Sequence, residues 1–258
     1  MKYFLFYLII LLTNIIQGIT GFAGTILAMP FSLRLVGMNV AVPVLNLLGM
    51  LSGVYVFAGN RKSVVWKEVI RSASVMGVAL IAGVFIRKAL SSNQRGLYIT
   101  LGIIVLLLAV RGLYITFFRD TKKGETKSAD SECTGKKLTA FENVRQWALL
   151  IAAGTIHGMF VCGGPMLIAY LTEKIKEKDK FRATISTVWI ILNGLLLLIQ
   201  IIEGEWSPEL VKTSLISIPF LFAGMFVGSV LYKHLSQKLF TILTYVLLII
   251  SAVTLFFK

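Results

Sequence analysis

The polar side chains inside the long apolar segments of this chain are few and neutral. Their amides, hydroxyls and single imidazole can donate hydrogen bonds, so together they could bind a small anion. Polar residues buried in such segments usually face the protein interior or a water-filled path. Hydrogen bonding between helices uses the same residue types and is the alternative. The candidates are Gln17, Thr20, Asn46, Ser52, His157, Thr184, Thr187 and Asn193.

Catalytic chemistry is not indicated by the residues present. General acid–base catalysis and metal binding need clustered carboxylates, histidines or cysteines. All twelve carboxylates lie in or beside loops, and Cys133 and Cys162 form no CxxC pair. No G-x-x-x-x-G-K-[ST] phosphate loop is present either. We therefore predict no catalytic residue, no metal, no cofactor and no ATP-driven pump.

Glycine interrupts two apolar segments at matching positions, residues 18–24 and 154–165. One interpretation is close helix packing through small residues. We favour the other, in which each helix is broken and its loose backbone lines a cavity. New half-helices would begin at residues 21–25 and 163–165, and their unpaired N–H groups and positive dipole ends could hold a small anion. The candidate positions are Gly18, Gly21, Gly24, Gly158, Gly163, Gly164 and Pro165.

The composition is that of a helical membrane protein with several spans. Of 258 residues, 57% are hydrophobic and only 15% are charged, whereas soluble domains are nearer half and a quarter. The basic residues that give the formal net charge of +14 lie between the apolar runs, as the positive-inside bias produces. They do not form a basic stripe interleaved with aromatic residues, which nucleic-acid binding would favour. This excludes a soluble enzyme, a disordered chain and a nucleic-acid-binding module.

A bilayer core requires roughly 20 apolar residues per helical span. By this measure the chain has two groups of four hydrophobic segments, and the first segment of each group is expected to be broken or re-entrant. The segments are residues 3–36, 40–58, 70–90, 97–118, 147–171, 183–202, 210–235 and 239–257.

A polar stretch at residues 119–145, with seven basic and five acidic residues, separates the two groups. We predict an N-terminal membrane repeat over residues 1–118, this linker, and a C-terminal membrane repeat over residues 146–258. Gln17-Gly18 matches His157-Gly158 at an offset of 140 residues, and Gly24 matches Gly164 at the same offset. Such matches in a common order indicate a duplicated unit, which is frequent in transporters.

Loop charge predicts that the two repeats are inverted. The turn at residues 60–67 is basic and is placed inside, whereas its counterpart at residues 203–209 is acidic and is placed outside. The linker is then cytoplasmic. The basic segment 87–95 falls outside, against the charge rule.

With these motifs in view, the sequence resembles the TauE/SafE family of integral membrane proteins, which are described as sulfite or organosulfur exporters. The resemblance rests on the first glycine motif followed by Pro30, and on the basic turn at residues 60–62 before Trp66. The second glycine motif and Arg182-Ala-Thr184 continue it, so that it covers the whole chain.

The resemblance implies secondary transport of small anions such as sulfite, sulfonates or sulfoacetate, by alternating access around two broken helices. It also implies a multi-pass protein of a prokaryotic plasma (inner) membrane. The expected partners are the anion and the lipid bilayer, with no nucleic acid, and a homo-oligomer is left open. A passive anion channel or an accessory membrane subunit is the alternative, and a membrane-embedded enzyme is less favoured.

Overall fold

The computed structural model describes residues 2–90, 140–175, 177–232 and a few positions between 95 and 110. Within these residues its regular elements are helices joined by short turns. This confirms the predicted all-helical membrane fold. The predicted segments 97–118 and 239–257 and most of the linker lie outside the described residues, apart from those single positions. The elements are α1 (Lys2–Thr20), α2 (Ala23–Val36), α3 (Met38–Asn60), the short helix η1 (Arg61–Ser63), α4 (Trp66–Ala89), α6 (Ala140–Phe160), α7 (Gly164–Lys174), α8 (Lys178–Ile202) and α9 (Pro208–Tyr232).

Five described helices, α1, α3, α4, α8 and α9, are long and apolar enough to cross a membrane. Several helices begin before the predicted apolar segments. Trp66 starts α4 ahead of residue 70, and Ala140 starts α6 inside the stretch assigned to the linker. The apolar count identifies the part of a helix that fits the bilayer core, whereas the backbone hydrogen bonds continue into the polar region beyond it.

The chain reverses direction at each glycine motif. Between α1 and α2, Gly21 adopts a left-handed backbone with φ of 81°, and Gly24 then lies against Thr13 and Gln17 of α1. Between α6 and α7, Val161 adopts φ of 57°. The short α2 and α7 therefore each pack back on the helix before them.

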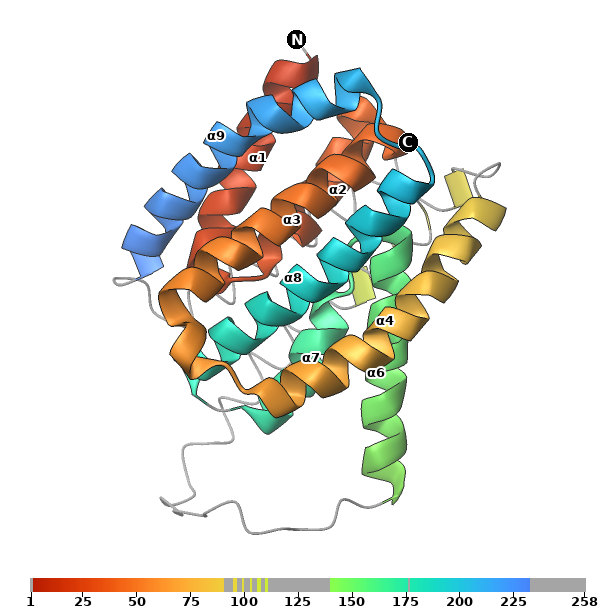
Figure 1. The fold of residues 1–258 in the computed structure, drawn as a ribbon, viewed down its shortest axis with the longest axis vertical. Helices are drawn as coiled ribbons and strands as arrows, with labels where there is room; N and C mark the ends of the chain where they lie inside the picture. The colour runs from red at the N-terminus through yellow and green to blue at the C-terminus, as the bar shows by residue number, and fades with distance from the viewer. Residues whose placement is uncertain are drawn as a thin grey trace.

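The packing of the two halves follows one scheme (Figure 1). α1 packs against α9 of the other half, and α6 packs against α4 in the same way, while α3 and α8 lie side by side at the centre. Both outer pairs are close because small residues meet backbone. A Cβ on Gly18 would lie 2.7 Å from the carbonyl oxygen of Met225, and Cβ atoms on Gly83 and Gly158 would collide with the carbonyl oxygens of Thr155 and Leu80.

The central helices α3 and α8 run antiparallel. Asn46, near the start of α3, donates a hydrogen bond to Gln200 near the end of α8, at 3.2 Å. Further along α3, Gly53 lies against Ser186 and Ile190 in the first half of α8. The two helices hold the same place in the two predicted repeats, and antiparallel equivalents are what inverted repeats would produce; the repeat organisation stays a prediction. The orientation in a membrane stays a prediction.

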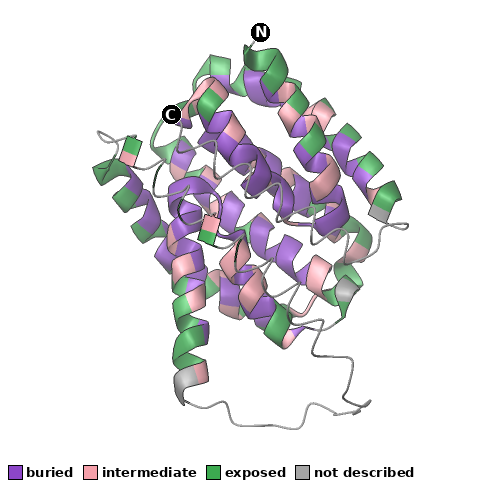
Figure 2. Cartoon of the chain, turned by 180° about the vertical axis from the view of Figure 1, so that it is seen from behind, coloured by how far each residue is buried: buried purple, intermediate pink, exposed green. Residues whose placement is uncertain are grey.

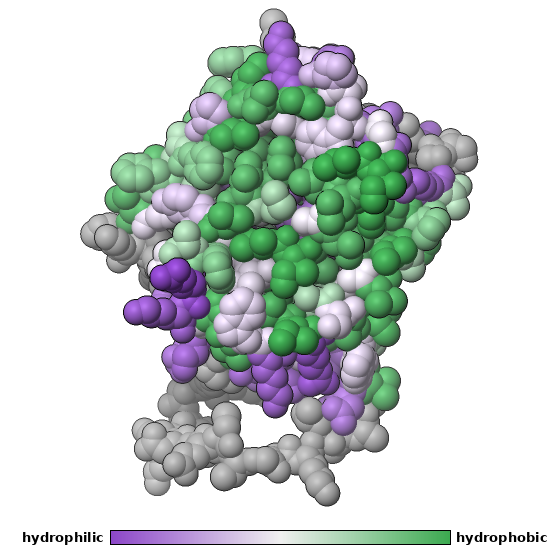
Figure 3. Space-filling view, viewed as in Figure 1, coloured by the Kyte–Doolittle hydropathy of each residue, from purple (hydrophilic) through white to green (hydrophobic). Residues whose placement is uncertain are grey.

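The outer surface suits lipid. Buried residues concentrate in the inner helices (Figure 2), and a broad apolar area lies above a hydrophilic lower end (Figure 3). Large apolar side chains on the outer helices are exposed, for example Val78 on α4 at 74% and Phe226 on α9 at 65%. A soluble monomer rarely exposes so much contiguous apolar surface.

Ion pairs explain the basic segment that contradicted the charge rule. Arg87 and Lys88, at the end of α4, pair with Glu205 at 3.1 Å and Glu203 at 2.5 Å. Acidic residues after α8 thus neutralise the basic ones at the same end of the molecule. Tyr3 donates to Glu209 at 3.2 Å and places the start of α1 there as well.

The basic turn lies at the opposite end. The N–H of Val65 donates to Thr184 Oγ1 at 3.0 Å, so the segment after η1 is tied to the start of α8. The acidic residues follow the end of α8. Its 25 residues separate the two ends by about 37 Å.

Candidate functional site

The two helix breaks meet at a small cavity in the centre of the molecule. It has room for about one water molecule. Its walls come from six helices and the two breaks, and four of the predicted site residues, Gln17, His157, Gly164 and Asn193, are among them. The lining residues are Gln17, Phe22, Thr25, Ile26, Gly49, His157, Val161, Gly164, Trp189 and Asn193.

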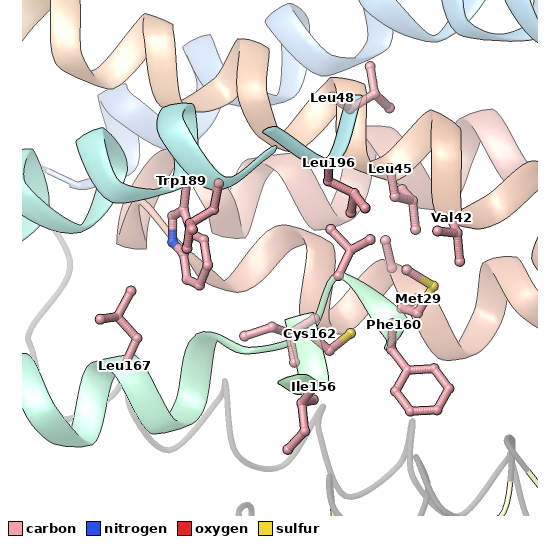
Figure 4. Packing of buried hydrophobic residues seen from close by; sticks show 14 of the residues in the cluster. Met29, Val42, Leu45, Leu48, Ile156, Phe160, Cys162, Leu167, Trp189 and Leu196 are labelled. Atoms are coloured by element: carbon pink, nitrogen blue, oxygen red, sulfur yellow. The ribbon is translucent and has the colours of Figure 1, made fainter. Parts of the chain in front are cut away.

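His157, Trp189 and Asn193 form a polar and aromatic cluster at this cavity. His157 Nε2 and Asn193 Oδ1 lie 2.8 Å apart, and the imidazole stacks on the Trp189 ring with centroids 4.9 Å apart. Figure 4 shows Trp189 extending from α8 toward the α6–α7 break, where Cys162 lies. Within the described part of the chain, Trp189 Nε1 and His157 Nδ1 are buried and have no hydrogen-bond partner. Buried polar atoms rarely lack a hydrogen-bond partner, so these two nitrogen atoms are candidate ligand contacts.

The start of α2 does not present the free N–H groups that the glycine motif predicted. Thr20 Oγ1 accepts from the N–H groups of Phe22 and Ala23, both at 3.1 Å, and Gln17 Oε1 accepts from Gly24 at 2.6 Å. The prediction was wrong for these three amides because the chain supplies its own side-chain caps. Gln17 Nε2 also donates to Ser52 at 2.9 Å, so both ends of its amide are occupied.

The start of α7, which Gly163 precedes, differs because within the described residues no side chain accepts a hydrogen bond from its first N–H groups, as Thr20 and Gln17 do at α2. Pro165 stands in its first turn, where the missing N–H costs nothing. A Cβ on Gly163 would collide with the carbonyl oxygen of Ala153, so only glycine fits there. Gly164 lines the cavity, and the positive end of α7 therefore faces it.

Several predicted site residues have contacts that are typical of structural roles. Gly18 and Gly158 pack against neighbouring helices, as described above. Asn46 Nδ2 donates to the carbonyl oxygen of the lining residue Asn193 at 3.0 Å, but Asn46 itself is absent from the cavity wall. Thr187 bonds to its own helix at Ala183, and Thr184 holds Val65.

Ser52 lies at a second small cavity beside the first. Both cavities are bordered by Thr25 and Gly49, and the bond from Gln17 to Ser52 lies between them. Gly24 and Asn14 also line the second cavity. The polar interior thus continues from the helix breaks along α1 and α3.

One carboxylate is buried although it stands close to a loop in sequence. Glu68, in the first turn of α4, accepts a hydrogen bond from the Tyr170 hydroxyl at 2.7 Å. The Arg71 guanidinium lies over the rings of Trp147 and Tyr170. In the part of the chain that the structure describes, no group of histidine, cysteine, aspartate and glutamate is suited to hold a metal ion.

Comparison with known proteins gives one family. The family model described as "Sulfite exporter TauE/SafE" matches residues 6–255. Among curated proteins, the chain is similar to a "Probable inner membrane transporter protein TsaS" of Comamonas testosteroni, with 27% identity over 103 residues. That match spans 40% of this chain and 43% of the relative. No solved structure matches the chain.

Proposed function

This chain belongs to the TauE/SafE family and is an integral multi-pass membrane protein of the cell membrane, and from this premise we propose that it is a secondary transporter of small anions. The substrates we propose are sulfite or organosulfur anions, including sulfonates and sulfoacetate. The family description and the name of the similar transporter both favour transport over an enzymatic activity.

The observation that carries the proposal is the uncapped start of α7 at a buried cavity. The positive end of a helix, the Trp189 indole N–H and the carboxamide of Asn193 together offer donors to an oxyanion. Among the residues that the structure describes, no lysine or arginine lines the cavity. An anion held by dipoles and neutral donors can leave again, whereas a buried cation would hold it more tightly.

The size of the cavity supports a closed state of an alternating-access cycle. A sulfur oxyanion is larger than the water molecule that fits there, so the walls must move for it to enter. Both helix breaks lie at this point, and the antiparallel α3 and α8 lie between the outer helix pairs. Movement of one half against the other around this centre would open the cavity to either side.

Transport into proteoliposomes tests the proposal. We expect saturable uptake of radiolabelled sulfite, a sulfonate or sulfoacetate, accelerated when the vesicles are preloaded with the same anion. Uptake that does not saturate and shows no such acceleration would identify a passive channel instead. Failure of every sulfur anion, with and without a proton gradient, would overturn the proposal.

A further inference from the structure

A broken helix presents two opposite ends at one place. The start of α2 is positive, but the end of α1, a few residues earlier, carries the negative end of its own dipole. α1 has no basic residue in its last turn to offset this. An anion approaching the α1–α2 break would therefore meet attraction and repulsion together.

Arg182, from the start of α8, reaches the end of α1. Its Nη2 donates a hydrogen bond to the carbonyl oxygen of Gly18 at 2.7 Å. Its aliphatic stem lies beneath Gly21, where a Cβ would be 2.9 Å from Arg182 Cγ. One turn further on, Ser186 donates to the carbonyl oxygen of Gly21 at 3.4 Å. The first turns of α8 thus hold a positive charge against the last carbonyls of α1.

The second break lacks this arrangement. The only basic residue in the last turn of α6 is His157, whose ring is engaged with Asn193. Among the described residues, no lysine or arginine hydrogen-bonds to the last carbonyls of α6. Arg182 therefore distinguishes the α1–α2 break from its counterpart.

We propose that Arg182 is a positioning residue that makes the α1–α2 break attractive to anions by cancelling the negative end of α1. It acts through the helix end and not by contact, since it is absent from the cavity wall. The inference rests on the proposed function and adds an element to the same site. Because an electrostatic potential acts in proportion to charge, loss of Arg182 should affect a dianion more than a monoanion.

The test compares Arg182→Gln and Arg182→Lys in proteoliposomes, with methanesulfonate as the monoanion and sulfoacetate as the dianion. Arg182→Gln leaves the negative end of α1, equivalent to about half a charge, without its positive partner, and we expect KM for the monoanion to rise about fivefold. A dianion interacts with the same potential twice as strongly, so the factor is squared and its KM should rise about 25-fold. The maximal rate should change less than about twofold, and Arg182→Lys should stay near the wild type. The control is Arg145→Gln, which removes an exposed arginine paired with Glu173 and should leave both KM values unchanged.

Three results would overturn the inference: equal effects on the two anions, equal effects of Arg182→Gln and Arg182→Lys, or a lower maximal rate with unchanged KM. If Arg182→Gln is not recovered folded, Gly21→Ala displaces the arginine stem sterically and must show the same dianion preference in its KM change. If the wild type transports the sulfur anions and Arg182→Gln has the same KM values, this inference is wrong and the proposed function stands. A wild type that transports only chloride or nitrate removes the sulfur substrates, and the inference then requires that Arg182→Gln raises KM for that anion while Arg182→Lys does not. A wild type that transports no anion removes both proposals.

Discussion

At the residue scale, the two helix breaks share a left-handed backbone at equivalent positions, Gly21 and Val161, which lie 140 residues apart (161 − 21). Glycine adopts this conformation without penalty, but for a β-branched residue it costs about 1–3 kcal/mol. The Val161 N–H is bonded to the carbonyl oxygen of His157 at 2.7 Å, and its side chain is buried. The surroundings therefore hold the strained residue in place next to the cavity.

The two asparagines separate a binding role from a packing role. We expect Asn193→Ala to raise KM for the transported anion by about 10- to 100-fold, the loss of one charge-assisted hydrogen bond together with the partner that orients His157. Asn46→Ala removes bonds from a side chain that does not line the cavity to the Asn193 carbonyl and to Gln200, and it should lower thermal stability and leave KM within about twofold. Transport kinetics and unfolding in detergent measure both effects. Unchanged KM in both variants would assign both asparagines to packing.

Gly164 tests whether the cavity must stay open. A Cβ there would lie 2.5 Å from the end of the flexible Ile26 side chain, so a larger side chain can be accommodated in the fold but fills the cavity. We expect Gly164→Leu to be recovered folded and to transport less than about a tenth of the wild-type rate. Gly59→Leu is the matched control, because nothing lies within 4 Å of a Cβ at that position. Wild-type uptake by Gly164→Leu would place the anion site elsewhere.

The sequence could indicate which residue types stand at the centre, but not all of their roles. Gln17, His157 and Asn193 were predicted because polar side chains in apolar segments usually face the interior, and Gly164 was predicted because its glycine motif interrupts the segment. Trp189 was missed, since one more aromatic residue in an apolar segment is typical of a core. Capping by Thr20 and Gln17 depends on the path of the chain after the turn, which residue types do not reveal.

At the element scale, close approach of helices depends on glycine at particular turns. The α4–α6 contact at Gly83 leaves no space for a side chain, whereas Gly77 on the same helix has only Leu195 at 3.7 Å. Both pairs of outer helices use such contacts, α1 with α9 and α4 with α6. In lipid, where apolar surfaces gain little by associating, close packing of this kind holds helices together.

We predict that Gly83→Ala destabilises the protein by about 1–3 kcal/mol, because the methyl group would collide with the carbonyl oxygen of Thr155. Gly77→Ala should be neutral or stabilising by up to about 1 kcal/mol, since alanine favours helix and the space is sufficient. Thermal unfolding in detergent compares the two variants. Equal stability of Gly83→Ala and Gly77→Ala would contradict the packing role of Gly83.

The helices themselves were predictable because about 20 apolar residues in a row have few alternatives to a membrane span. Their ends were not, as the starts of α4 and α6 show. Polar residues beyond the bilayer core do not reveal whether the helix continues.

At the scale of the whole molecule, the two charged ends define a topology. Arg61, in η1, lies beside the start of α8, and Glu205 lies just past its end. The positive-inside bias places the Arg61 end in the cytoplasm. This is the same orientation that loop charge predicts from the sequence, and it stays a prediction.

Cysteine labelling decides the topology. In a background with Cys133→Ser and Cys162→Ser, we expect Arg61→Cys to react with a membrane-impermeant maleimide only after permeabilisation and Ser207→Cys to react in intact cells. Lys62→Cys and Glu209→Cys serve as second positions for each end. Labelling of positions 61 and 207 from the same side would rule out inverted repeats.

The unequal caps of the two breaks would have an energetic consequence in the alternating-access cycle that we propose. In an exact two-fold structure, the states open to either side would mirror each other and be equally populated. Here Thr20 and Gln17 satisfy the amides of one break, whereas the other keeps an uncapped helix start and a strained valine. A difference of about 1–3 kcal/mol between them corresponds to a ratio of about 5 to 150 between the two resting populations. We therefore expect the binding site of the substrate-free protein to be open mainly to one side of the membrane. The anion gradient alone sets the direction of net flux.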